Sequence, residues 1–259
     1  MKLWRAVLEK ELLELRRSPI LVLSLASLPL TIVALPLGLY AWLLVAAPDQ
    51  VVDFLRELYA IPTEGGKAAV LASLLAKNWL PMFLVVPIFL PIMISAQSVG
   101  GERERRTLEP LLATPVSTLD IVLGKSVAAV VPSVVLTWTA AIIFCGGIDL
   151  LAFRFTHLLV LPDTTWTFST LVIAPLLALF GNTLAVVLSS VILDPRAAQN
   201  LAGMTVVPML GALGAQLAGR VSLTWRFYVG FAVFVALLDV LMVYAASRAF
   251  HREKLLVGR

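Results

Sequence analysis

The sequence predicts an all-α, polytopic integral membrane protein with six transmembrane helices, and three observations support this. First, the chain is 60% hydrophobic and only 14% charged, whereas soluble domains average about 25% charged residues. Second, uncharged runs long enough to cross a bilayer recur along the chain. Third, the basic residues gather in blocks beside these runs, as is typical of the flanks of membrane spans.

We expect a single transmembrane domain over residues 1–259. A helix needs roughly 20 apolar residues, at about 1.5 Å each, to cross the hydrocarbon core. The predicted spans are residues 18–48, 78–101, 119–148, 164–193, 197–219 and 227–246. Prolines bend the first two spans, and the carbonyls that those prolines leave free must be satisfied by neighbouring groups or by water.

The segments outside these spans also have expected structures. Residues 1–17 predict an amphipathic helix in the plane of the lipid headgroups, with a simple charged flank as the alternative. Residues 51–61 predict a small external helix that stops before a proline. A turn carrying Asp149, Arg154, His157 and Asp163 is expected between the third and fourth spans.

Local features of the last three spans can be predicted as well. Trp166, near the outer edge of the fourth span, is expected to anchor it at the membrane interface. Asp194 is expected to cap a helix whose first residue is Pro195. Small residues in the fifth span are expected to let helices approach closely. They are Gly203, Gly211, Gly214 and Gly219.

The distribution of basic residues predicts the orientation. With both termini inside, 14 of the 20 Lys and Arg residues lie inside and six outside, which agrees with the positive-inside rule. The six outside are Arg56, Lys67, Lys77, Arg154, Arg220 and Arg226. We therefore expect a multi-pass protein of the cytoplasmic (inner) membrane with both termini in the cytoplasm.

Catalytic and cofactor chemistry is not indicated. Gly124-Lys125-Ser126 resembles the end of a phosphate-binding loop, but that motif needs a glycine where Leu119 stands. Cys145 is the only cysteine, so no internal disulfide or cysteine-based metal site is possible. The chain has no basic domain with interleaved aromatic residues, so the sequence does not indicate nucleic-acid binding. We expect no enzyme, no metal and no cofactor in this chain.

The densest charge cluster lies between the second and third spans, in a segment that we call the 102–117 segment. Glu102 and Arg106 are four residues apart, and so are Arg105 and Glu109, so both pairs can stabilise a helix. A short polar break between two membrane spans needs neither this many charges nor two prolines. The cluster therefore indicates a folded element rather than a simple loop.

The rest of this segment predicts a short helix followed by the start of the third span. Thr107 can cap a helix over residues 108–113, which Pro115 ends. Ser117 and Asp120 form a capping box for the third span. A rigid element of this kind can transmit a push into two spans at once. A solvated loop whose charges only fix the topology is the alternative.

The 102–117 segment, ERERRTLEPLLATPVS, followed by Leu123-Gly124-Lys125, resembles the signature loop of ABC transporter permeases of the type-2 exporter class. Many members of that class have glycine where Arg106 stands. Weaker matches lie before the first span (Lys10-Glu11-Leu12), at residues 194–199, and in the tail at residues 250–256. The resemblance therefore touches the whole chain, although only the central motif is specific.

The resemblance implies a permease subunit that pairs with a second permease subunit, identical or different, and with two copies of a cytoplasmic ABC ATPase that binds ATP and Mg. It implies that a coupling helix docks into a groove on the ATPase. The residues of this contact would be Glu102, Arg103, Glu104, Arg105, Arg106, Thr107, Leu108, Glu109, Leu111, Leu112, Thr114 and Pro115. A second, smaller contact would involve Asp194, Pro195, Arg196 and Gln199. ATP-driven closure of the ATPase would then move the permease halves as near-rigid bodies.

One ionisable residue lies inside a predicted span. Asp239 is near the middle of the sixth span, where an ionised carboxylate costs about 2.5–3.5 kcal/mol. Such residues usually face a cavity or a partner. The alternative is a protonated or hydrogen-bonded side chain that joins helices, with Asn182 or a tyrosine hydroxyl as its partner. Asn182 and Gln97 are further polar residues within spans.

Together these features predict the permease of an ATP-driven exporter embedded in membrane lipid. One rival function is a membrane scaffold or maturation factor that acts on a partner outside the membrane. Another is a stand-alone secondary transporter, which we expect to carry more ionisable residues within its spans than Asp239. The sequence favours no cargo among ions, drugs, lipids, peptides and polysaccharides.

Overall fold

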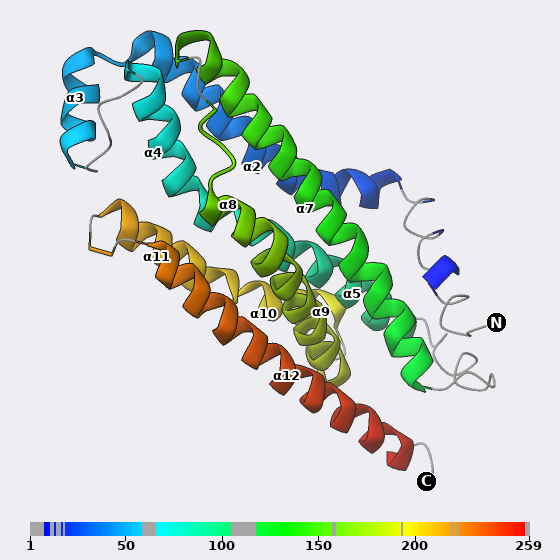
Figure 1. Cartoon of the computed structure of the whole chain (residues 1–259). Helices are drawn as coiled ribbons and strands as arrows, with labels where there is room; N and C mark the ends of the chain where they lie inside the picture. Colours follow the sequence, from blue (N-terminus) through cyan, green and yellow to red (C-terminus); the bar gives the residue numbers. More distant parts are fainter. Residues whose placement is uncertain are drawn as a thin grey trace.

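The computed structural model describes residues 8–10, 13, 17, 19–58, 66–104, 118–156, 159–192, 194–218, 220–221 and 223–256, and every regular element in them is a helix. In chain order the helices are α2 (Pro19–Ala46), α3 (Asp49–Leu58), α4 (Gly66–Phe83), α5 (Val85–Glu104), α7 (Thr118–Thr156), α8 (Thr164–Phe168), the π-helix η1 (Ser169–Ile173), α9 (Ala174–Val191), α10 (Pro195–Gly203), α11 (Val206–Leu217) and α12 (Trp225–Leu256). They form an elongated bundle (Figure 1). Residues 8–10, 13 and 17 of the predicted N-terminal helix are helical, and the rest of 1–17 lies outside the described residues.

The described part of the chain contains six helices that are long and apolar enough to cross a membrane, which confirms the predicted fold class. The candidate spans are Val22–Ala46, Gly66–Ala96, Leu123–Phe155, Thr164–Ser189, Arg196–Leu217 and Trp225–Tyr244. The second begins at Gly66 rather than at 78, because residues 68–76 are apolar except for Ser73 and continue the helix past Lys77. The helix α3 confirms that a separate short helix precedes this span.

The third span is longer than predicted, and the expectation that Asp149 and Arg154 lie in the turn is wrong. Both residues lie in α7, which continues to Thr156. Asp163 does lie between α7 and α8, and His157 is outside the described residues. Asp149 is buried, and its Oδ1 accepts hydrogen bonds from the backbone N–H groups of Val160 (2.8 Å) and Leu161 (3.0 Å). The carboxylate therefore holds the extended chain that follows α7 against this helix instead of forming a turn.

The centre of the bundle is the pair formed by α5 and α9, which make the most extensive contact of any two helices described. The helices come closest at Gly181, where an added Cβ would lie 2.3 Å from the carbonyl oxygen of Ile88. Only glycine permits this approach of backbone to backbone. The helices α7 and α10 also pack on α5, so α5 connects most of the bundle.

Backbone carbonyls near three prolines are satisfied by side chains from other helices. Pro36 cannot donate to the carbonyl of Ile32, four residues earlier, and the Nε1–H of Trp79 donates to it at 2.8 Å. Pro81 likewise frees the carbonyl of Lys77, which accepts from Nε2 of Gln216 at 3.2 Å. These contacts confirm that neighbouring groups satisfy freed carbonyls.

A third freed carbonyl lies at the π-helix. The N–H of Ala174 donates to Ser169, five residues earlier, and Pro175 has no N–H, so Thr170 loses its usual helical donors. The Nε1–H of Trp138, on α7, donates to this carbonyl at 2.8 Å. Indole donors on two different helices, α4 and α7, therefore stabilise bends in α2 and in the fourth span.

The expectation that Trp166 is an interfacial anchor is wrong. Its side chain is only 1% exposed, its Nε1–H donates to the carbonyl of Ala76 at 3.0 Å, and its ring stacks on Phe144 with centroids 5.0 Å apart. The helix α8 begins inside the bundle, after the chain that Asp149 holds against α7 (Figure 1). Asp163 caps α8 through the N–H of Trp166 at 2.7 Å, which fixes the indole in the core.

The expected close packing at the glycines of the fifth span is not seen among the described residues. A Cβ added at Gly211 or Gly214 meets no described atom within 4 Å, and one at Gly203 meets only Phe89, at 3.7 Å. Gly219 lies outside the described residues. The helix α11, all of which is described, contains no buried residue.

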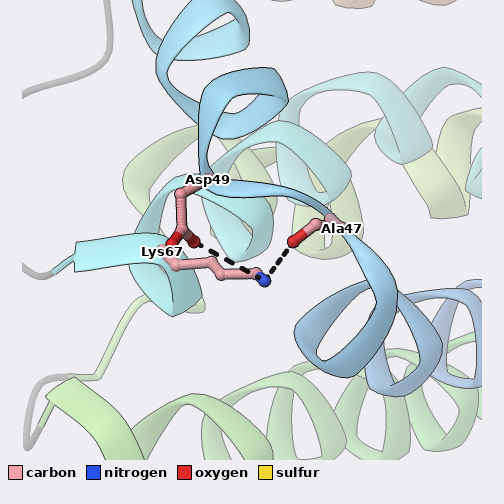
Figure 2. A network of polar contacts seen from close by, with 3 residues as sticks. All are labelled: Ala47, Asp49 and Lys67. Carbon is pink, nitrogen blue, oxygen red and sulfur yellow. Dashed lines mark hydrogen bonds and ion pairs between the residues drawn. The ribbon is translucent and has the colours of Figure 1, made fainter.

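The two ends of the bundle differ. At one end, which we call the α5–α7 end, α5 ends and α7 begins, and α9 and α12 also end there (Figure 1). At the other, which we call the α3 end, Lys67 forms an ion pair with Asp49 at 3.8 Å and donates a hydrogen bond to the carbonyl of Ala47 (Figure 2). Lys67 therefore joins the start of α4 to the end of α2.

Candidate functional site

The 102–117 segment connects α5 and α7 at the α5–α7 end. The backbone of Glu102, Arg103 and Glu104 forms the last turn of α5, and Thr118 begins α7. The side chains of those three residues, the whole of 105–117 and the side chain of Asp120 lie outside what the structure describes. The predicted ion pairs, Thr107 cap, short helix over 108–113, stop at Pro115 and capping box therefore remain predictions.

The two helices that lead into this segment, its stems, are described in detail. The stems of α5 and α7 pack against each other. Between them lies Lys125 of α7, whose Nζ donates to the Oγ of Ser98 on α5 at 2.8 Å, with the carbonyl oxygen of Ser98 at 3.4 Å. Lys125 is only 8% exposed. A buried ammonium group thus joins the two stems below the segment.

Sequence reasoning identified Lys125 as part of a motif but missed its contact. Gly124-Lys125-Ser126 was compared with a phosphate-binding loop, whereas the structure places Gly124 and Lys125 in α7, where both are buried. The available signal was a lysine directly after a glycine near the start of α7, where a small residue lets the neighbouring helix approach. Ser98, on the other stem, had no sequence signal.

The second predicted contact lies at the start of α10. Asp194 confirms the predicted cap, because its Oδ1 accepts from the N–H of Arg196 at 2.9 Å and Pro195 is the first helical residue. Ala198 and Ala202 are buried on the side of α10 that packs against α5 and α9. The side chain of Arg196 is exposed, and that of Gln199 is half-buried. This turn therefore presents polar groups beside the central helix pair.

The intramembrane polar residues are brought near a common level but not into contact. The helices α9 and α12 run in the same direction (Figure 1), and the rings of Phe168 and Trp225 meet with centroids 4.8 Å apart. Asn182 and Asp239 each lie 14 residues beyond this contact (168 to 182, 225 to 239). Both side chains are buried, at 0% and 4% exposure.

The hydrogen bond expected between Asp239 and Asn182 is absent from the described contacts. Asn182 instead accepts at Oδ1 from the Oγ of Ser95 on α5, at 2.7 Å. Among the residues described, neither carboxylate oxygen of Asp239 has a hydrogen-bond partner, and the hydroxyl of Tyr228 is unpaired too. The side chain of Gln97 lies outside the described residues. Ser95, which joins Asn182 to the second span, was not identified from the sequence.

Groups that could hold a metal were also sought. Within the described residues, no three His, Cys, Asp or Glu side chains are placed to bind one. The buried polar residues inside the bundle include Ser95, Asn182 and Asp239. The fold and these sites together define a multi-pass helical membrane protein that carries its most charged element where its second and third spans meet.

Comparison with known families gives the class a name. The sequence model described as ABC-2 family transporter protein matches residues 5–247. The chain therefore belongs to the ABC-2 transporter family, as its resemblance to those permeases predicted. Members are the membrane component of a transporter and are not themselves catalytic. No curated protein sequence matches the chain at a significant level.

Proposed function

We propose that this permease is the transmembrane subunit of an ATP-driven exporter in the cytoplasmic membrane, working with two copies of a separate cytoplasmic ATPase that binds ATP and Mg. In this proposal the α5–α7 end and both termini face the cytoplasm. The observation that carries the proposal is the position of the 102–117 segment, which connects α5, the helix at the centre of the bundle, to α7.

The packing of α5 supports the transmission of force. A push on the 102–117 segment reaches α5 and α7 directly, and α5 packs against α9, α7 and α10. At Gly181 the backbones of α5 and α9 are in contact, so the two helices cannot slide past each other without a large rearrangement. A displacement at the segment would therefore move the core as a near-rigid body.

The start of α10 would be the smaller ATPase contact. Its Asp194-capped first turn presents an exposed Arg196 next to α5 and α9. A helix N-terminus with its cap holds its exposed side chains in a fixed direction. The ATPase would thus contact two elements that both rest on the central helix pair.

A second permease subunit would cover α11. An 18-residue stretch of the span Arg196–Leu217 has the lowest mean hydropathy among those of the six spans, 1.2, yet only 11% of it is buried. If lipid alone surrounded the chain, the least apolar span should be the most buried, because polar groups are costly in hydrocarbon. The open faces of Gly211 and Gly214 would let a helix of the second subunit approach closely.

The decisive experiment substitutes charges in the 102–117 segment. We expect Arg105→Glu with Arg106→Glu to abolish coupling of ATP hydrolysis to the permease and to weaken co-purification of the ATPase, while membrane insertion is unchanged. The matched control is Arg220→Glu with Arg226→Glu at the α3 end, which should change neither the coupling of ATP hydrolysis nor the co-purification of the ATPase. Unchanged ATPase association in the first variant would contradict the proposed contact.

Two further outcomes distinguish the rival functions. Co-purification of any ATPase with the native chain argues against a stand-alone secondary transporter. ATP-dependent flux in sealed vesicles argues against a scaffold that acts on a partner outside the membrane.

A further inference from the structure

Lys125 is buried although its place in the sequence does not require it. A lysine beside a membrane span normally extends its ammonium group to water, and it contributes equally well to topology when exposed. Lys125 instead turns toward α5, is 8% exposed, and donates to the Oγ of Ser98 at 2.8 Å. Holding a charged group away from water costs free energy unless a specific partner compensates.

The two partners lie at matched depths below the 102–117 segment. Ser98 is six residues before the end of α5 at Glu104, and Lys125 is seven residues after the start of α7 at Thr118. At about 1.5 Å per residue, both lie roughly 9–10 Å from the helix ends. The contact therefore closes a loop of chain, from 98 to 125, that contains the whole segment.

We propose that Lys125 and Ser98 form a clasp that makes the stems of α5 and α7 move as one body when a partner pushes on the 102–117 segment. Lys125 is then a positioning residue for coupling. Without the clasp, a push on the segment can separate or tilt the stems, and part of the displacement is lost before it reaches α9. The coupling role rests on the proposed function, whereas the joining of the stems does not.

The size of the effect follows from the chemistry of the contact. Hydrogen bonds to charged groups contribute enough to change an equilibrium by roughly ten- to a hundredfold. Lys125→Met keeps a chain of similar length and apolar contact but removes the charge and all donors. Ser98→Ala removes the hydroxyl alone, and Ser98→Thr retains it.

The first test measures the stems without any partner. Spin labels are placed at Leu123 of α7 and Asn200 of α10, both exposed, in a chain whose Cys145 is replaced by alanine. The helix α10 packs on α5, so this distance reports on α5 against α7. We expect a narrow distance distribution in the parent chain and in Ser98→Thr, and a broader one in Lys125→Met and Ser98→Ala. The same distribution in all four chains would overturn the clasp.

The second test measures coupling in the complex of full-length permease with its ATPase. We expect Lys125→Met to reduce permease-dependent stimulation of ATP hydrolysis about tenfold, while ATPase co-purification stays within about twofold of the parent. Lys77→Met, which changes an exposed lysine far from the α5–α7 end, should leave both unchanged. Unaltered stimulation in Lys125→Met overturns the coupling role.

The two tests separate the two proposals. If the parent chain retains no ATPase at all, the proposed function fails while the distance measurement still decides the clasp. If Lys125→Met and Ser98→Ala both lose the ATPase as well as stimulation, the clasp shapes the docking surface rather than transmitting motion, and the coupling role is overturned. Stimulation of ATP hydrolysis that is lost in Ser98→Ala but retained in Ser98→Thr supports the coupling role.

Discussion

The second and fifth spans of this permease are used in opposite ways. An 18-residue stretch of the span Gly66–Ala96 has a mean hydropathy of 2.1 and is 78% buried inside the bundle, whereas that of Arg196–Leu217 has a mean hydropathy of 1.2 and is 11% buried. Hydropathy alone does not decide burial along this chain, because the corresponding stretch of Val22–Ala46 has the same mean hydropathy as that of Gly66–Ala96, 2.1, and is only 28% buried. In lipid an apolar side chain gains little by leaving hydrocarbon for protein, so packing shape and polar contacts decide which spans lie inside.

The contrast extends to the polar backbone. At the second span, Trp79 donates to the carbonyl of Ile32 that Pro36 frees in α2, and the carbonyl that Pro81 frees accepts a hydrogen bond from Gln216 of α11. In the exposed region, the glycines of α11 face open space within the described chain. The first region is thus completed by its own chain, and the second is the face on which we propose that a second subunit packs. Four substitutions test this difference, from the largest expected effect to the smallest.

Gly181→Ala should have the largest effect, because the new methyl group would lie 2.3 Å from the backbone oxygen of Ile88. Overpacking costs about 1–3 kcal/mol or more, and here the clash is with backbone, which cannot rotate away. We expect a marked loss of folded protein and a lower unfolding temperature in detergent. Gly211→Ala, where the methyl group meets no described atom within 4 Å, is the control. Equal unfolding temperatures for the two variants would contradict the central position of the α5–α9 contact.

Gly211→Trp should act on assembly rather than on the fold of the chain. A large side chain on the open face of α11 blocks the close approach of a second subunit. We expect the oligomer to dissociate, as measured by chemical cross-linking in membranes, while the unfolding temperature of the monomer is unchanged. Val240→Trp, at a 68% exposed position on α12, should leave the oligomer intact. Oligomers that survive Gly211→Trp would place the second subunit on another face.

Trp79→Phe should destabilise the buried region moderately. It removes the donor to the carbonyl of Ile32 while keeping most of the aromatic contact. An unsatisfied buried carbonyl costs about 1–3 kcal/mol. We expect this loss in reversible unfolding by denaturing detergent. Trp42→Phe, at a 63% exposed position, should reduce the free energy of unfolding much less. An equal reduction at both positions would show that the hydrogen bond from the indole of Trp79 is not the cause.

Asp239→Asn should have the smallest effect on stability, and in the opposite direction. The carboxylate is 4% exposed and has no hydrogen-bond partner among the described residues, so an amide that cannot carry charge removes a cost of burial. We expect stabilisation by about 1 kcal/mol, or roughly 2–4 °C in unfolding temperature. A fall in ATP-dependent transport together with this rise would indicate that Asp239 is retained for function. Lower stability would instead show that the carboxylate joins helices.

The sequence predicted that the 102–117 segment lies between the second and third spans, but it did not predict the contacts of the helices beside it. The cap at Asp194 was predicted because capping is decided within a few residues. The clasp between Lys125 and Ser98 was not, since the partners are 27 positions apart and meet only when α5 packs on α7. Asn182 was expected as a partner of Asp239, but in the structure Asn182 accepts a hydrogen bond from Ser95 of α5 instead.

The sequence by itself determined the number of spans, the cap at Asp194 and the family, because apolar length, charge and local motifs are properties of short stretches of chain. Only the tertiary structure decided which faces lie inside. It buried Trp166 where an interfacial position was expected, and it placed the close helix contact at Gly181 rather than at the glycines of α11. The physical reason is that lipid and protein are almost equally apolar surroundings, so hydrophobicity indicates that a helix is in the membrane and not what it touches there.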